Sequence, residues 1–229
     1  MSTILFKNAA LLDPLRSDLL EGHHVLVEDR LIKEVSDRPI EASVDRVIDL
    51  KGKTLMPGLI DLHVHAVAVE LDLSQQARMA NVLVTLRSTM LLRGMLKRGF
   101  TTVRDAGGPS FALKRAIDEG RFPGPRIYPS GAMITVTSGH GDFRQLSDLP
   151  RTIGGMLTRM EQVGGSMIAD SPDEVRVRVR EQLMQGASQI KLTAGGGVSS
   201  PFSPIDVSTF TEAELHAAVE AAENWGTYV

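Results

Sequence analysis

Hydrophobic and polar residues alternate over short distances in the first fifty residues, which is typical of strands with one buried face. The alternation predicts four strands, at residues 3–8, 24–28, 31–35 and 46–49. Turn-forming sequences such as Asp13-Pro14 separate them. We therefore expect residues 1–53 to form a small β module.

From Thr54 onward the pattern changes to strands that alternate with amphipathic helices, which indicates βα units and a parallel sheet. Helices are expected at residues 81–98, 110–119, 172–185 and from 212 to about 225, and strands at 101–104, 126–130, 188–193 and from 227. A long loop rich in Gly, Ser and Thr should follow residue 130.

The number of these units determines the fold class that we expect. Four full βα units and the start of a fifth follow Thr54, whereas roughly eight units in about 250 residues make a closed barrel. Four units alone would leave a hydrophobic sheet with open edges. We therefore expect residues 54–229 to be the first half of a (β/α)8 TIM barrel of the α/β class. The chain would then be a fragment, or one half of a split protein.

Composition limits the remaining possibilities. A hydrophobic content of 42% suits a globular protein, and a net charge of −3 gives no basic surface for nucleic acid or an anionic membrane. The sequence has no cysteine, so any metal must be bound by nitrogen or oxygen. It also lacks a leader-like start and any apolar run of roughly 18 residues. We expect a cytoplasmic protein.

Two histidines lie two residues apart at the end of an apolar strand. Residues i and i+2 of a strand point to the same face, so His63 and His65 can converge on one metal ion. Catalytic groups of barrel enzymes follow the carboxyl ends of strands, which favours a metal site over two packed histidines. Asp61 shares this face and fits either a hydrogen bond to a ligand or a local one.

Lys191 interrupts the apolar strand predicted at 188–193. An ammonium group pointing into the protein is costly to desolvate. A lowered pKa would let the amine react with carbon dioxide, and the resulting carbamate could bridge two metal ions. Alternatively, the aliphatic part of the Lys191 side chain could carry the ammonium group to the end of the strand, and the residues alone favour neither explanation.

The segment PGLIDLHVH at residues 57–65, together with IKL at 190–192, resembles the amidohydrolase superfamily. Residues 1–53 resemble the small β-sandwich domain that flanks its barrels. The segments TTVRDAGG at 101–108 and TSGHGD at 137–142 resemble the branch of imidazolonepropionase relatives and metal-dependent Xaa-Pro dipeptidases (prolidases) and carboxypeptidases. The likeness extends over essentially the whole chain.

The resemblance implies a binuclear metal site. His63 and His65 would bind one of two divalent ions, expected to be Zn²⁺, and a carboxylated Lys191, formed with carbon dioxide, would bridge both. In that family, histidines on strands five and six and a general-base aspartate on strand eight complete the site. None of them has a counterpart in this sequence up to Val229. Activity should therefore require the remainder of the barrel.

Two further residues are candidates for substrate binding. His140 follows the third strand in a glycine-flanked loop, where it could bind a substrate carboxylate or lie on the surface. Tyr228 begins the predicted fifth strand and could contact the substrate carbonyl if it points inward. For Arg104 and Asp105, at the end of the second strand, we favour a structural ion pair over a place in the pocket.

The implied activity is metal-assisted hydrolysis of an amide bond in a small substrate by a hydroxide shared between the ions. An Xaa-Pro or similar dipeptide is the expected substrate. The alternatives are a cyclic-amide hydrolase of the imidazolonepropionase type and a non-catalytic truncated or split half. We expect a homo-oligomer with no nucleic-acid or membrane partner.

Overall fold

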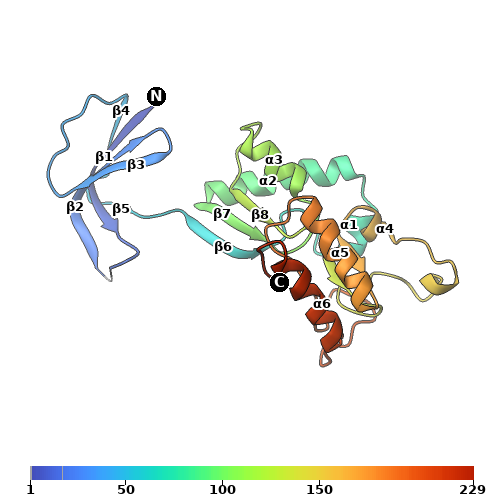
Figure 1. Cartoon of the computed structure of the whole chain (residues 1–229). Helices are drawn as coiled ribbons and strands as arrows, with labels where there is room; N and C mark the ends of the chain where they lie inside the picture. Colours follow the sequence, from blue (N-terminus) through green and yellow to red (C-terminus); the bar gives the residue numbers. More distant parts are fainter. Residues whose placement is uncertain (1, 17) are drawn as a thin grey trace. The chain divides into compact units, whose positions relative to one another are not determined.

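The computed structural model describes residues 2–16 and 18–229, which form two compact units that divide between Gly58 and Leu59 (Figure 1). The first unit is a β module. The second unit contains every residue that the sequence proposes for the site, so its strand ends and loops position the chemistry.

The N-terminal unit is one sheet in the described part of the chain. Its strands are β1 (Thr3–Leu12), β2 (Leu19–Glu28), β3 (Leu31–Ser36), β4 (Arg46–Asp49) and β5 (Thr54–Leu55). They lie in the order β3-β2-β1-β4, with β5 also paired to β1. Four of these strands were predicted, and the pairing of β5 extends the sheet beyond residue 53. The structure shows a single sheet here and not the two facing layers of a sandwich.

The second unit begins with three parallel strands, β6 (Leu59–Val64), β7 (Phe100–Asp105) and β8 (Arg126–Pro129). Helices α2 (Asn81–Lys97) and α3 (Phe111–Asp118) cover one face of this sheet (Figure 1). The core between sheet and helices is made of Val64, Ala66, Leu92, Val103, Leu113 and Ile127. The predicted alternation of strands and helices is confirmed here.

The second layer of this unit is built on α5 (Pro172–Met184) and α6 (Glu212–Glu223), which lie side by side (Figure 1). Ser171 caps α5 by accepting the Glu174 N–H, and Thr211 and Glu214 form a capping box on α6. Both helix starts were predicted from these residues. The apolar faces of the two helices pack with Ile134 and Ile190 into a second core.

The segment after residue 130 is more ordered than the long loop that the sequence predicts. It contains β9 (Met133–Thr135), a 3₁₀ turn η1 (Arg151–Ile153), α4 (Arg159–Gln162) and β10 (Ser166–Ile168), which pairs in parallel with β9. Strands of three residues have too few positions to show a period. A short helix α1 (Leu73–Ala77), also not predicted, precedes α2.

The strand predicted at 188–193 is an extended segment with an isolated bridge between Ile134 and Leu192. The Ile134 N–H donates to the Lys191 carbonyl at 2.9 Å, and the Ile190 N–H donates to the Tyr228 carbonyl at 2.9 Å. These bonds give parallel neighbours in the expected order, but too few to form a regular ladder. Over residues 2–16 and 18–229, the strands do not close into a barrel.

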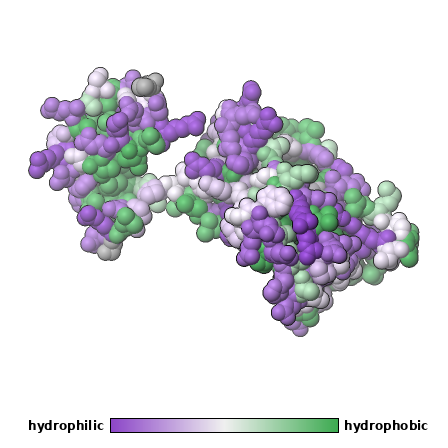
Figure 2. All heavy atoms as spheres, in the orientation of Figure 1, coloured by the Kyte–Doolittle hydropathy of each residue, from purple (hydrophilic) through white to green (hydrophobic). Residues whose placement is uncertain are grey.

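Large apolar side chains are exposed at several places in the second unit, among them the edge strand β6 and the segment around η1. Strand β6 lies at a sheet edge, where Ile60 and Leu62 are exposed. Leu149 and Ile153, near η1, are exposed as well, and Figure 2 shows hydrophobic atoms at the surface there. Among the described residues, no helix is both long and apolar enough to cross a membrane.

Replacement of Leu92 by Ala should lower the free energy of unfolding by about 2–5 kcal/mol, because its side chain is fully buried beneath α2. Leu86→Ala on the same helix is the matched control, since Leu86 is 57% exposed and should cost less than about 0.5 kcal/mol. Urea unfolding of the two variants measures the difference. Equal losses would contradict the assigned core.

Candidate metal and substrate site

The two strand-end histidines lie close together in the structure. His63 is in β6, His65 follows its last residue, and their ring centroids are 5.5 Å apart with an interplanar angle of 69°. The Asp61 carboxylate accepts the His63 backbone N–H at 3.0 Å. Asp61 therefore makes the local strand-end hydrogen bond and helps to fix the backbone that carries His63.

The tautomer of His65 follows from one contact. Its Nδ1 lies 3.2 Å from the carbonyl oxygen of Gly107, which can only accept, so Nδ1 carries the proton. The lone pair is then on Nε2, free to bind a metal ion. Backbone carbonyls orient metal-binding histidines in this way in many metalloproteins.

His63, Lys191 and Tyr228 line one cavity of about 360 Å³. The strand-end and extended segments of the second unit supply its walls, which also include Arg104, Ser130 and Gln189. No Asp or Glu is among the described residues that line it. The cavity is therefore rich in potential positive charge and suits an anionic occupant.

Burial and neighbouring positive charges lower two pKa values in this cavity. Burial lowers the pKa of the Lys191 amine, and the nearby Arg104 guanidinium lowers it further. Burial likewise lowers the pKa of His63, with Lys191 and His65 adding to the effect. Both shifts favour neutral nitrogen, which is the form that binds metal ions or reacts with carbon dioxide.

Arg104 lines the 360 Å³ cavity, which is the alternative that the sequence reasoning considered but did not favour. Its Nε donates to the Leu62 carbonyl at 2.7 Å, and Nη1 lies 3.4 Å from the Tyr228 hydroxyl. The ion pair with Asp105 expected from the sequence is wrong, because neighbouring residues of β7 point to opposite faces of the sheet. The strand period could have placed Arg104 on the same face as the histidines.

Asp105 is fully buried on the other face. Its carboxylate accepts the Ala66 N–H at 3.1 Å, directly after His65, and the hydroxyl of Ser110 at the start of α3. It also accepts the Gly107 N–H. Burial raises the pKa of Asp105 to about 6 even though these bonds oppose the shift. One carboxylate thus joins the ends of β6 and β7 to α3.

His140 lies in a loop held by the ion pair of Asp142 and Arg144 at 2.6 Å. Its Nδ1 is 3.1 Å from the Ser200 hydroxyl, and a Cβ at Gly197 would come within 2.1 Å of that nitrogen. Burial lowers the pKa of His140, and the charges of Lys191 and His65 lower it further. His140 is therefore partly buried and within electrostatic range of the site, although it does not line the 360 Å³ cavity.

The side chains present fit a metal ion only in part. In the described part of the chain, no three side chains drawn from His, Asp and Glu come together as a metal-binding group. Two neighbouring imidazoles, one of which shares a cavity with an amine of lowered pKa, nevertheless fit the nitrogen and oxygen ligation of zinc if the amine carries a carboxylate. This chain therefore offers a partial ligand set.

The model of the amidohydrolase family matches residues 54–229 of the chain. The protein therefore belongs to the amidohydrolase family. Ochratoxinase from Aspergillus niger is 31% identical over 230 residues, which cover 96% of this chain and 48% of that protein.

Solved structures give the same class. An amidohydrolase structure is 51% identical in sequence to this chain and superposes with a TM-score of 0.92. A prolidase solved with N-methylphosphonate-L-proline is 41% identical and also has a TM-score of 0.92. An Xaa-Pro dipeptidase with bound methionine shares 29% with a TM-score of 0.85. All of this chain is covered in each case, against 55%, 55% and 56% of those chains.

The predicted resemblance to amidohydrolases of the prolidase branch is thus confirmed. The chain spans about half the length of the curated relatives and solved structures it matches. Its mixed α/β fold with an N-terminal sheet corresponds to that half.

The buried carboxyl of Asp105 should make stability fall as pH rises from about 4 to above 6. Its pKa is higher in the folded than in the unfolded state, so the folded state binds the proton more tightly and is penalised when it is lost. The full change from this group is about 3 kcal/mol. Asp105→Asn should remove that change.

The measurement is the difference in unfolding free energy between wild type and variant at several pH values. In this difference the contributions of the other carboxyl groups cancel. Asp206→Asn, at an exposed position, is the control and should leave the pH profile unchanged. A profile of Asp105→Asn parallel to that of wild type would contradict the assigned raised pKa.

Proposed function

We propose that this chain supplies one part of the metal centre of a hydrolase that cleaves an amide bond in a small, carboxylate-bearing substrate, an Xaa-Pro or similar dipeptide. The observation that carries the proposal is that His63, whose ring lies 5.5 Å from that of His65, lines the same cavity as Lys191, whose pKa is lowered. The prolidase and dipeptidase relatives support this substrate class.

His63 and His65 would hold one divalent metal ion, expected to be Zn²⁺, through neutral imidazole nitrogens. Lys191, once carboxylated, would provide two oxygens to bridge to a second ion. When bound, such ions lower the pKa of water and polarise a carbonyl group. The contact of His65 with the Gly107 carbonyl keeps its Nε2 directed as a ligand.

Arg104 acts on the same site through its charge. A guanidinium beside Lys191 disfavours the ammonium form and would stabilise the anionic carbamate. It lies within 3.4 Å of the Tyr228 hydroxyl, so the two groups can orient one another. Tyr228, whose hydroxyl accepts from Arg104, would keep its own proton to donate to the substrate carbonyl.

The substrate carboxylate would be bound on the positive side of the site. Lysine and arginine line the cavity without an acidic residue, and His140 lies in electrostatic range. A dipeptide carries such a carboxylate next to its scissile amide. The remaining ligands and the general base would come from further strands, in a longer polypeptide or a second chain, and that assembly is the form to screen with Xaa-Pro dipeptides.

Lys191→Ala should weaken zinc binding by at least about tenfold, because the bridging group is lost. Metal analysis after equilibration with zinc and bicarbonate measures the effect, and native mass spectrometry detects the added mass of one carbon dioxide in the wild type. Lys97→Ala, at an exposed position of α2, is the matched control and should bind like wild type. Unchanged zinc binding by Lys191→Ala would exclude the bridging role.

His140→Ala should raise the KM for an Xaa-Pro dipeptide by about tenfold or more in the complete enzyme, since a charge-assisted hydrogen bond to the carboxylate is removed. Gly197→Ala tests the same contact without deleting the ring, because its Cβ would displace His140. Steady-state kinetics of both variants should show a larger change in KM than in kcat. Wild-type KM values in both would rule out a role of His140 in binding.

A further inference from the structure

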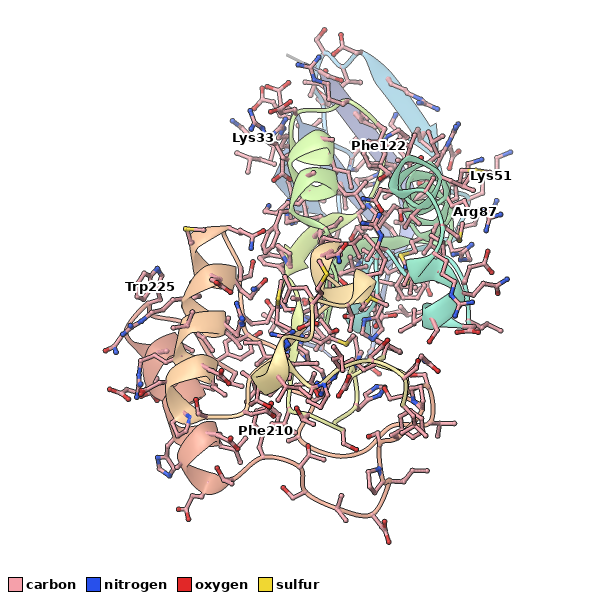
Figure 3. All side chains as sticks on the ribbon, turned by 90° about the vertical axis from the view of Figure 1, so that its right-hand side faces the viewer. Lys33, Lys51, Arg87, Phe122, Phe210 and Trp225 are labelled. Atoms are coloured by element: carbon pink, nitrogen blue, oxygen red, sulfur yellow. The ribbon has the colours of Figure 1, made fainter. Side chains whose placement is uncertain are left out.

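A second cavity, of about 450 Å³, lies between α2 and α3 under the loops that follow β6 and β7. Val84 and Ser88 of α2 face Leu113 and Ala116 of α3 across it. Phe122 closes one side, and Figure 3 shows it between the two helices. The cavity shares no lining residue with the one that contains His63 and Lys191.

His65 is the only ionisable side chain among the described residues that line this cavity. None of its described lining residues is Asp, Glu, Lys or Arg. Its hydroxyl groups are satisfied within α2: Thr85 donates to the Asn81 carbonyl and Ser88 to the Val84 carbonyl, both at 2.9 Å. An occupant therefore needs no charge and few hydrogen bonds.

One side chain holds the loop after β6, which covers the cavity, through hydrogen bonds to its backbone. Gln76 of α1 donates to the Val67 carbonyl at 2.9 Å and accepts the Val69 N–H at 2.7 Å and the Glu70 N–H at 3.2 Å. Its polar groups are thus used in holding the loop after β6. Met160, in α4, and Met133, in β9, also line the cavity.

The cavity is not lined by the large apolar side chains that α2 exposes at the surface. The side chains of α2 that line it differ from Leu83, Leu86 and Met90, which are exposed on that helix. It lies between neighbouring helices that cover the same sheet.

We infer that this cavity is a binding site for a small, uncharged, apolar molecule of one or two rings, separate from the site that contains Lys191. An apolar cavity of about 150 Å³ is enough to hold benzene, and ligand pockets commonly have 300–1,000 Å³. His65 forms part of its wall, so an occupant contacts the ring of a proposed metal ligand. Binding there requires neither a metal ion nor hydrolysis.

The test uses indole as the probe and the methionine methyl groups as reporters, with the chain labelled by ¹³C-methyl methionine. Met133 and Met160 line the cavity, whereas Met90 and Met184 are exposed elsewhere in the same unit. Saturable shifts confined to Met133 and Met160 are the expected result. Absence of these shifts, or equal shifts at Met90 and Met184, would overturn the assignment.

Two variants fill the space from opposite walls. Ala116→Phe on α3 and Thr85→Phe on α2 should each weaken indole binding at least tenfold, while Ala213→Leu, at an exposed position of α6, should not. Far-ultraviolet circular dichroism verifies folding, and either folded variant suffices. Wild-type affinity in a folded filling variant would contradict the site.

Two further ligands define its chemistry and its separation from the other cavity. Without added metal, indole-3-carboxylate should bind at Met133 and Met160 at least tenfold more weakly than indole, because no lysine or arginine is among the described residues that line the cavity. The dipeptide Ala-Pro should not shift them at all. Shifts at both methionines with Ala-Pro would make this cavity part of the substrate site and so overturn the inference, whatever the outcome for hydrolysis.

Discussion

A buried carboxylate with only hydrogen-bond donors around it holds the strand ends on which the site is built. Asp105 bonds to the backbone after His65, to the backbone of Gly107 and to the cap of α3. The Gly107 carbonyl in turn fixes the tautomer of His65. The positions of both the strand end that carries His63 and His65 and the α3 helix therefore depend on a group whose own charge is costly to bury.

The second constraint is electrostatic. Lys191, Arg104 and His63 line a cavity without an acidic side chain among its described lining residues. Burial lowers the pKa of Lys191 and of His63, the Arg104 charge lowers both further, and the Lys191 charge adds to the shift of His63. Reaction of the amine with carbon dioxide would convert one of these charges into an anion and relieve the repulsion. The same excess of positive charge favours a substrate with a carboxylate.

Those parts of the fold and of the candidate site that are encoded by residues close together in the sequence could be predicted. The capping residues Ser171 and Thr211 gave the starts of two helices, and the two-residue period placed His63 and His65 on one face. Short strands such as β9 escaped prediction because three residues show no period. The strand at Lys191 was expected to be regular, but its pairing is limited to a single bridge.

Other parts of the site arise only from tertiary structure. The approach of Arg104 to Tyr228 joins residues 124 positions apart, and no local pattern encodes it. The raised pKa of Asp105 likewise follows from burial on the face of β7 that the helices cover. The cavity between α2 and α3 depends on how two helices pack, which the periodicity of either helix alone does not determine.

X-ray absorption spectroscopy of the zinc-loaded chain tests the central claim most directly, because it detects ligands by type and distance. The account predicts outer-shell scattering from two imidazoles and a first shell of nitrogen and oxygen near about 2.0–2.1 Å. The imidazole signal should disappear in the double variant His63→Asn, His65→Asn. Zinc bound without imidazole scattering, or an unchanged spectrum in the double variant, would contradict the account.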